Sequence, residues 1–301
     1  GMTFDQALAL QKKLKDTDEY RGRFDVKFRQ GLTYEHIDLM LSNPMLSDIR
    51  VRKALLYGLN RKQLTDALFE GKQEPALHNI HPLDPNFSDN VVKYEYNPEK
   101  AAQLLDEAGW KLDPATKIRM KDGKKLSMTL MTTAQNKTRE LVQVYLQNEW
   151  KKLGIEIQPK TEPARVYFGE TVRKGKYPAM AMFAWIASPD NPPRSTMHSA
   201  MIPTAKNAYS GQNSGGYSNK EVDAAFDRII VEHDFNKRKK DMEFIQQRYA
   251  DEVPVIPLYL RSDVATVPTN LKNFKITGHQ FPDSQEVEYW DLGGDVAKKN
   301  N

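Results

Sequence analysis

The architecture of this chain is set by residues 43–76, NPMLSDIRVRKALLYGLNRKQLTDALFEGKQEPA. Ser47 or Asp48 can cap a helix in which apolar residues recur at helical spacing. Asn60 and Gln63 then have the spacing of a capping box, which begins a second helical segment. The stretch therefore predicts consecutive helices with a common apolar face.

A further helix is predicted by residues 94–110, YEYNPEKAAQLLDEAGW. Asn97 before Pro98 is typical of a helix start, because Asn caps the first turn and proline fits the first helical position. Gly109 is typical of the residue that follows a helix, and we expect Trp110 to fold back onto it. The segment between these helices is a loop rich in Pro and His.

Five segments of the chain have the apolar pattern of strands. They are residues 31–42, 126–132, 155–158, 179–186 and 255–260, and the run AMAMFAWI at 179–186 predicts a fully buried strand. Helical segments between strands imply right-handed crossovers within one sheet. We therefore predict an α/β fold with a mixed or largely parallel sheet flanked by helices.

Two of the helical patterns carry specific expectations. Residues 136–153 predict a helix that buries the side chains of Leu141, Val144, Tyr145 and Trp150. Ser218 with Glu221 has the spacing of a capping box, and it opens a helix whose apolar face contains Val222, Ala225, Phe226, Ile229 and Ile230. Both helices are expected to flank the sheet through these faces.

The composition excludes several classes of protein. The 301 residues include 44 basic and 40 acidic ones, and the net charge of +4 does not require a nucleic acid as partner. The absence of cysteine excludes disulfides, cysteine-based zinc sites and a thiol nucleophile. No apolar run approaches the roughly 20 residues that span a bilayer. Gly1 before Met2 is typical of an expression remnant, so we expect the natural N-terminus, with any export signal, to lie upstream.

The sequence carries no catalytic motif. Residues 169–176 resemble a P-loop, but five residues separate the two glycines where four are needed. His78 and His81 form an H-x-x-H pair, yet the neighbouring prolines predict a loop and no acidic partner stands at ligand spacing. We therefore predict no catalytic residues, no metal site and no cofactor.

Several motifs resemble those of the bacterial extracellular solute-binding proteins of family 5, the oligopeptide and dipeptide receptors of ABC importers. Besides the two helical stretches quoted above, they are YEHIDLMLSNP at 34–44, GYSNKEVDAAFD at 216–227 and VPVIPLY at 253–259. In this family two lobes joined by a hinge enclose the ligand. The resemblance implies that this chain is the C-terminal lobe of a type II periplasmic-binding-protein fold.

The resemblance also implies a division of the chain. Residues 2–41 are expected to be a hinge-proximal segment of the first lobe, and residues 42–265 the C-terminal ligand-binding lobe. Residues 266–301 are expected to return to the first lobe. Most of that first lobe is therefore expected to be missing from this chain.

The implied function is binding without chemistry. Such a receptor holds an extended peptide through main-chain hydrogen bonds, and lobe closure presents it to the ABC permease subunits in the membrane. We expect a monomer that is not an enzyme, located in the periplasm or anchored by lipid at the cell surface. Two alternatives stay open. One is the same fold with a non-peptide ligand, such as a sugar, metal chelate, haem or modified peptide, and the other is a hydrolase or sensor domain.

The resemblance directs attention to the end of the predicted strand 179–186. Peptide-binding members of the family commonly carry W-x-A-D there, and its Asp meets the α-ammonium of the ligand. In this sequence Trp185 is present, but Ser188 stands in place of the Asp. Asp190 would substitute for it if the loop bends. Otherwise the loss of the carboxylate favours a blocked, modified or non-peptide ligand, because an unpaired buried ammonium is costly.

The other candidate contacts lie in the long polar loop that follows, since ligands gather at the carboxyl ends of strands in α/β sheets. Glycines there let the backbone approach a ligand, and amides supply both donors and acceptors. The predicted ligand contacts are Trp185, Ser188, Asp190, Asn191, Arg194, Tyr209, Gln212, Asn213 and Tyr217.

Overall fold

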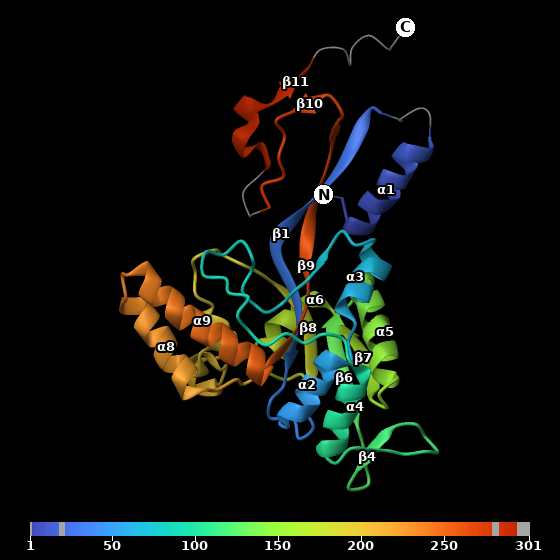
Figure 1. Ribbon diagram of the computed structural model, residues 1–301, viewed down its shortest axis with the longest axis vertical. Helices are drawn as coiled ribbons and strands as arrows, with labels where there is room; N and C mark the ends of the chain where they lie inside the picture. Colours follow the sequence, from blue (N-terminus) through green and yellow to red (C-terminus); the bar gives the residue numbers. More distant parts are fainter. Residues whose placement is uncertain (1, 18–21, 279–282, 294–301) are drawn as a thin grey trace.

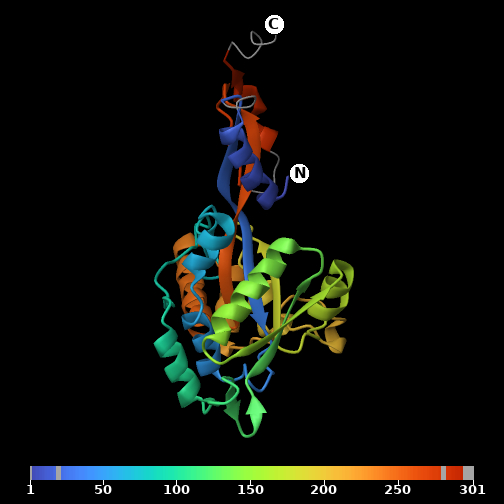
Figure 2. The same cartoon turned by 90° about the vertical axis from the view of Figure 1, so that its right-hand side faces the viewer.

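The chain folds into a larger body and a narrower arm. The computed structural model describes residues 2–17, 22–278 and 283–293. Two long strands, β1 (Phe24–Leu39) and β9 (Val255–Pro268), run through both parts (Figure 1). We call residues 31–261 the body and the described residues on either side of them the arm, which rises out of the body in Figure 2.

The body is built on a six-stranded sheet with the order β2-β9-β1-β8-β6-β7. The strands β6 (Ser127–Thr133), β7 (Glu156–Glu162) and β8 (Met180–Ile186) are parallel to one another, with β6 in the middle. β1 is antiparallel to β8 and β9, and β2 (Glu74–Pro75) forms the edge beside β9. The predicted α/β fold with a mixed sheet is confirmed.

Two groups of helices lie on either side of β1 and β9 (Figure 1). The first group encloses the main hydrophobic core and consists of α2 (Ile49–Tyr57), α3 (Arg61–Phe69), α4 (Pro98–Glu107) and α5 (Lys137–Lys151). The second group is α8 (Lys220–Val231) and α9 (Phe235–Glu252), which enclose a smaller core with Met197 and Val255. The sheet is therefore covered on both sides, as in other α/β folds.

The remaining elements are short. Three small strands form a separate sheet, namely β3 (Lys111–Leu112), β4 (Arg119–Lys121) and β5 (Lys124–Lys125). The others are α6 (Ala164–Val166), a π-helical turn (Tyr167–Val172), α7 (Arg194–Met197), β10 (Leu271–Lys272), β11 (Asp291–Leu292) and 3-10 turns at Ser199–Met201, Ala205–Asn207 and Asp283–Tyr289. Among the described residues, no helix combines the length and the apolar character needed to cross a membrane.

The helices of nine or more residues begin where a side chain caps the first turn. Asp48 caps α2, Asn60 caps α3 and Asn97 caps α4, each through a side-chain oxygen that accepts a backbone N–H. The predicted cap at Ser218 is wrong. Asn219 accepts the first free N–H groups of α8, so this helix begins one residue later than the capping-box spacing predicts.

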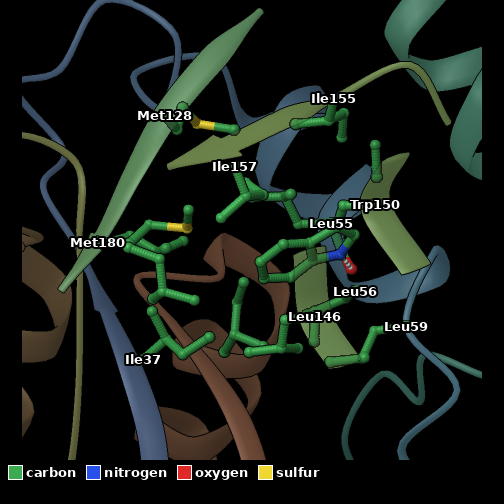
Figure 3. Packing of buried hydrophobic residues seen from close by; sticks show 14 of the residues in the cluster. Ile37, Leu55, Leu56, Leu59, Met128, Leu146, Trp150, Ile155, Ile157 and Met180 are labelled. Atoms are coloured by element: carbon green, nitrogen blue, oxygen red, sulfur yellow. Dashed lines mark hydrogen bonds between the residues drawn. The ribbon is translucent and has the colours of Figure 1, made fainter. Parts of the chain in front are cut away.

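Trp150 is the largest side chain that is fully buried in the body. Its Nε1 donates to the backbone carbonyl of Leu55 at 2.9 Å and so joins α5 to the last turn of α2 (Figure 3). Leu146, one helical turn earlier, is also fully buried. The prediction that Leu141 and Val144 face inward is wrong, because they are 54% and 50% exposed. They lie on the side of α5 opposite the line through Leu146 and Trp150.

The corrected orientation of α5 gives a direct prediction. Leu146→Ala should lower the free energy of unfolding by about 2–5 kcal/mol, because it leaves a cavity in the main core. The matched change Leu141→Ala on the exposed side of the same helix should alter it by less than about 0.5 kcal/mol. Urea unfolding followed by circular dichroism measures both values, and equal losses in the two variants would contradict this orientation.

The arm is built around a two-stranded ribbon with a helix packed against it, and it also contains the small β10–β11 sheet. Residues 24–30 of β1 pair with residues 262–268 of β9, and α1 (Phe4–Asp16) covers them through Ala7 and Leu14. The β1–β9 register shifts between Gln30 and Tyr34, and from Thr33 onward β1 also pairs with β8 inside the body. Because β1 and β9 belong to both parts, the lobe boundaries at residues 41 and 266 stay a prediction.

Candidate ligand-binding site

Two adjoining hollows lie where β8 ends. The larger has a volume of about 300 Å³ and the smaller of about 30 Å³. The smaller one is large enough to hold a water molecule, which needs about 10–15 Å³. The residues that line both hollows are Tyr34, Asn79, Trp185, Thr196 and Gln212. The smaller hollow is therefore an inner chamber of the larger.

Three segments supply most of the wall of the larger hollow. They are residues 185–188 at the end of β8, residues 191–196 of the following loop, and residues 79–84 of the loop before α4. Trp185 stands opposite Tyr34 in the register of β8 and β1, and its ring meets Phe183 edge to face with centroids 5.4 Å apart. An aromatic wall with a few polar groups is typical of small-molecule sites.

Some polar atoms of this wall have no protein partner. The side chain of Tyr34 is 4% exposed, and its Oη makes no hydrogen bond to any described residue. Asn79 Oδ1 is also buried and makes no hydrogen bond to any described residue. A buried polar group without a partner costs about 1–3 kcal/mol. Burial also raises the pKa of the Tyr34 phenol well above its usual value, so this hydroxyl keeps its proton and is available as a donor to a bound molecule.

Six of the nine predicted contacts line the hollows. Trp185 and Gln212 line both, while the others divide between the larger hollow (Ser188 and Asn191) and the inner chamber (Asn213 and Tyr217). Asn213 also holds its own loop together. Its Nδ2 donates to the carbonyl of His198 at 3.1 Å and to that of Tyr217 at 2.7 Å, and its Oδ1 accepts the Tyr217 N–H at 2.9 Å.

The other three predicted contacts, Asp190, Arg194 and Tyr209, line neither hollow. The carboxylate of Asp190 lies 3.6 Å from the guanidinium of Arg238 on α9. Arg194 forms an ion pair with Asp227 at 3.3 Å. The ring of Tyr209 lies 5.4 Å from the ammonium of Lys174. Each of these side chains is therefore engaged by a neighbour outside the hollows.

The sequence-based prediction missed residues from other parts of the chain. Tyr34 reaches the site from β1, and Asn79, His81 and Asp84 reach it from the loop rich in Pro and His. The sequence predicted that this loop lies between two capped helices, but not that it reaches the site. Its contact with the segment after β8 is a long-range feature, because the Asp190 N–H donates to Asp84 Oδ2 at 3.1 Å.

The two histidines of the H-x-x-H pair are tied to the backbone. His78 Nε2 lies 2.8 Å from the carbonyl oxygen of Ser88, and His81 Nε2 lies 2.7 Å from that of Gly31. In both residues Nδ1 accepts the N–H two residues later at 3.1 Å. Burial lowers the pKa of both imidazoles. Neither ring offers a free lone pair, and the described residues contain no group of three His, Asp or Glu side chains placed to hold a metal ion.

Comparison with known proteins identifies the family. The model of the bacterial extracellular solute-binding proteins, family 5 (middle region), matches residues 3–207, which is more than half of the chain. The chain belongs to this family. The fold described above is the fold of family 5 members, and it carries the hollows at the end of β8.

Three relatives illustrate the match. Oligopeptide-binding protein AppA of Bacillus subtilis is 32% identical to this family 5 chain, over 86% of the chain and 47% of AppA. The structure of the oligopeptide-binding protein of Thermus thermophilus complexed with a pentapeptide matches with a TM-score of 0.77 and 32% identity, over 91% of this chain and 48% of that one. The nickel-binding periplasmic protein of Escherichia coli is 25% identical, over 74% of this chain and 42% of that protein. The chain thus spans about half the length of the curated relatives it matches.

The hydrogen bonds of Asn213 predict a structural role that is separate from ligand contact. Asn213→Ala should lower the free energy of unfolding by about 1–3 kcal/mol, because it leaves buried backbone groups without partners. Gln212→Ala, the neighbouring change, should cost less than about 1 kcal/mol, since among the described residues the Gln212 side chain bonds only to the exposed hydroxyl of Ser195. Thermal unfolding of both variants measures the difference, and a smaller loss in Asn213→Ala than in Gln212→Ala would contradict it.

The lowered pKa values of His78 and His81 predict how stability depends on pH. The unfolded imidazoles titrate near about pH 6.5, so below this pH the unfolded chain binds more protons than the folded one. The two neutral histidines therefore make their full contribution to stability above that pH. This contribution is lost as the pH falls toward the lowered pKa values that His78 and His81 have in the folded chain. Urea midpoints between about pH 7.5 and 5.5 should therefore fall less steeply in His78→Asn/His81→Asn than in the parent. A slope equal to that of the parent in the double variant would contradict the assignment of this pH dependence to the two histidines.

Proposed function

We propose that this chain is the C-terminal, ligand-binding lobe of the substrate-binding component of a bacterial ABC importer, and that its ligand is an oligopeptide. The observation that carries the proposal is the hollow of about 300 Å³ at the end of β8, with Tyr34 and Trp185 in its wall. This volume is at the lower end of the range for small-molecule sites, as expected for half of a site that a second lobe completes. The names of two family members, which bind oligopeptides, support the same ligand class.

The binding mode follows from the groups in the wall. Trp185 offers an aromatic face, and Ser188, Asn191 and Gln212 offer short polar side chains beside it. Such groups suit an extended peptide, whose main-chain amides are the same in every sequence, with water filling the gaps around varied side chains. Asp190, Arg194 and Tyr209 would contact ligand only after a rearrangement of their present partners.

The arm is the part of the chain that we assign to the first lobe. Residues 2–41 and 266–301 would then belong to it, with β1 and β9 crossing between the lobes as the hinge. Closure of the two lobes over the hollow would present the loaded receptor to the membrane permease. We propose a monomer in the periplasm or anchored by lipid at the cell surface, with no catalytic activity. The residues that complete the first lobe would lie outside this chain.

A second candidate keeps the fold and changes the ligand to a metal chelate or another non-peptide solute. One family member named above is a nickel-binding protein, and Ser188 stands where peptide-binding members commonly carry an Asp. The backbone hydrogen bonds of His78 and His81 speak against direct metal ligation by this pair. A chelate held by its organic part would still fit.

Titration of the isotope-labelled chain with a mixed tetrapeptide to octapeptide library tests the peptide proposal. Peptides should shift the NMR signal of the Trp185 indole N–H, and mass spectrometry should recover them intact. Trp185→Ala should lose the shifts of neighbouring backbone signals, whereas Leu141→Ala, on the exposed side of α5, should retain them. Cleaved peptides would favour a hydrolase, and shifts with nickel chelates but not with peptides would favour the second candidate.

A further inference from the structure

Asp84 places a carboxylate in the wall of the larger hollow although only 9% of the residue is exposed. Its Oδ1 accepts hydrogen bonds from Asn86 N at 2.8 Å and from Asn86 Nδ2 at 3.0 Å, and its Oδ2 accepts the Asp190 N–H at 3.1 Å. These bonds fix the carboxylate between the loop before α4 and the loop after β8. They leave part of its acceptor capacity unused, because an ionised carboxylate has about four acceptor sites.

The charge of this carboxylate is not compensated within the described chain. Asn86 Nδ2 also donates to Asp190 Oδ1 at 3.2 Å and so bridges the two acidic side chains. Arg238 lies 3.6 Å from Asp190, whereas no cation within ion-pair distance of Asp84 is found among the described residues. Arg238 is therefore the counter-charge of Asp190 and not of Asp84. Asp84, which lines the larger hollow, is thus left without a counter-charge among the described residues.

The other residues around the hollows include no Lys or Arg among those that the structure describes. His81 is neutral, because its Nδ1 accepts the Leu83 N–H and burial lowers the pKa of the imidazole. In the inner chamber a second carboxylate, Asp38, lies 3.2 Å from His36 Nε2 and accepts the Ser214 hydroxyl at 3.0 Å. Each hollow therefore has a carboxylate in its lining.

A buried carboxylate without a counter-charge is unfavourable, and a ligand cation placed against it offsets part of that cost. Hydrogen bonds between two ionised groups are also roughly twice as strong as neutral ones. We infer that Asp84 is the counter-charge for a cationic group of the ligand, either a primary ammonium or a guanidinium. The inference rests on the proposed function and makes it specific: among peptides, this site selects those that present a cation to Asp84. On a peptide, that cation is either the α-ammonium or a basic side chain.

The test uses the full chain, NMR titration suited to weak half-site binding, and four defined probes. Three are tetra-alanine amide with a free ammonium, its N-acetylated form, and N-acetyl-Ala-Lys-Ala-Ala amide. The fourth is agmatine, a cation that is not a peptide. The parent should bind at least one of the two cationic peptides tenfold or more tightly than the neutral one, and the preferred peptide identifies the source of the cation. Asp84→Asn should abolish the difference.

Two further variants separate charge from folding. Asp84→Glu keeps the charge and should keep most of the discrimination, and circular dichroism checks that each variant is folded. Asp66→Asn removes the same charge from the exposed Lys62–Asp66 pair and should bind like the parent. Discrimination that survives in a folded Asp84→Asn would overturn the inference.

The probes also keep this inference distinct from the peptide proposal. Equal binding of all three peptides to the parent would overturn the role of Asp84 and leave peptide binding intact. Agmatine binding that depends on Asp84, without binding of any peptide, would uphold the cation pairing and reject the peptide proposal. Binding of none of the four probes would reject both.

Discussion

β1 is the element on which the body, the arm and the hollows all depend. It pairs with β8 and β9 at once, so its body segment lies inside the sheet with a neighbouring strand along each edge. Since side chains alternate across a strand, Tyr34, His36 and Asp38 share one face, and Ile37 and Leu39 share the other. The apolar face enters the main core, whereas the polar face lines the inner chamber. One strand therefore anchors the sheet and supplies the floor of the candidate site.

Buried charge fixes β1 at the point where it leaves the body for the arm. Glu35 is fully buried, and its carboxylate pairs with Arg139 of α5 at 3.1 Å and with Arg261 of β9. Removing one partner of a buried ion pair costs about 3–5 kcal/mol, so this cluster strongly favours a single arrangement of the three elements. The face of β1 opposite the chamber is thereby held in place.

The features that the sequence predicts well are local. Caps at Asp48, Asn60 and Asn97 need only a side chain and the next turn of backbone, so the helix starts follow from short patterns. The inward face of α5 and the cap of α8 were mistaken for different reasons. Leu141 is apolar on an exposed face, which periodicity alone does not reveal, and Ser218 lies beside the better placed Asn219.

The residues of the candidate site were likewise predictable where local sequence determines their position, and not where long-range contacts do. The loop after β8 was predictable because ligands gather at strand ends, and the residues nearest the strand do line the hollow. Asp190 and Asp84 show what the sequence alone does not reveal. In the sequence Asp190 is the closer substitute for the carboxylate absent at Ser188, but Arg238, far along the chain on α9, lies beside it. Which carboxylate is left without a counter-charge is thus decided by a partner distant in sequence, and tertiary structure, rather than proximity to the motif, favours Asp84.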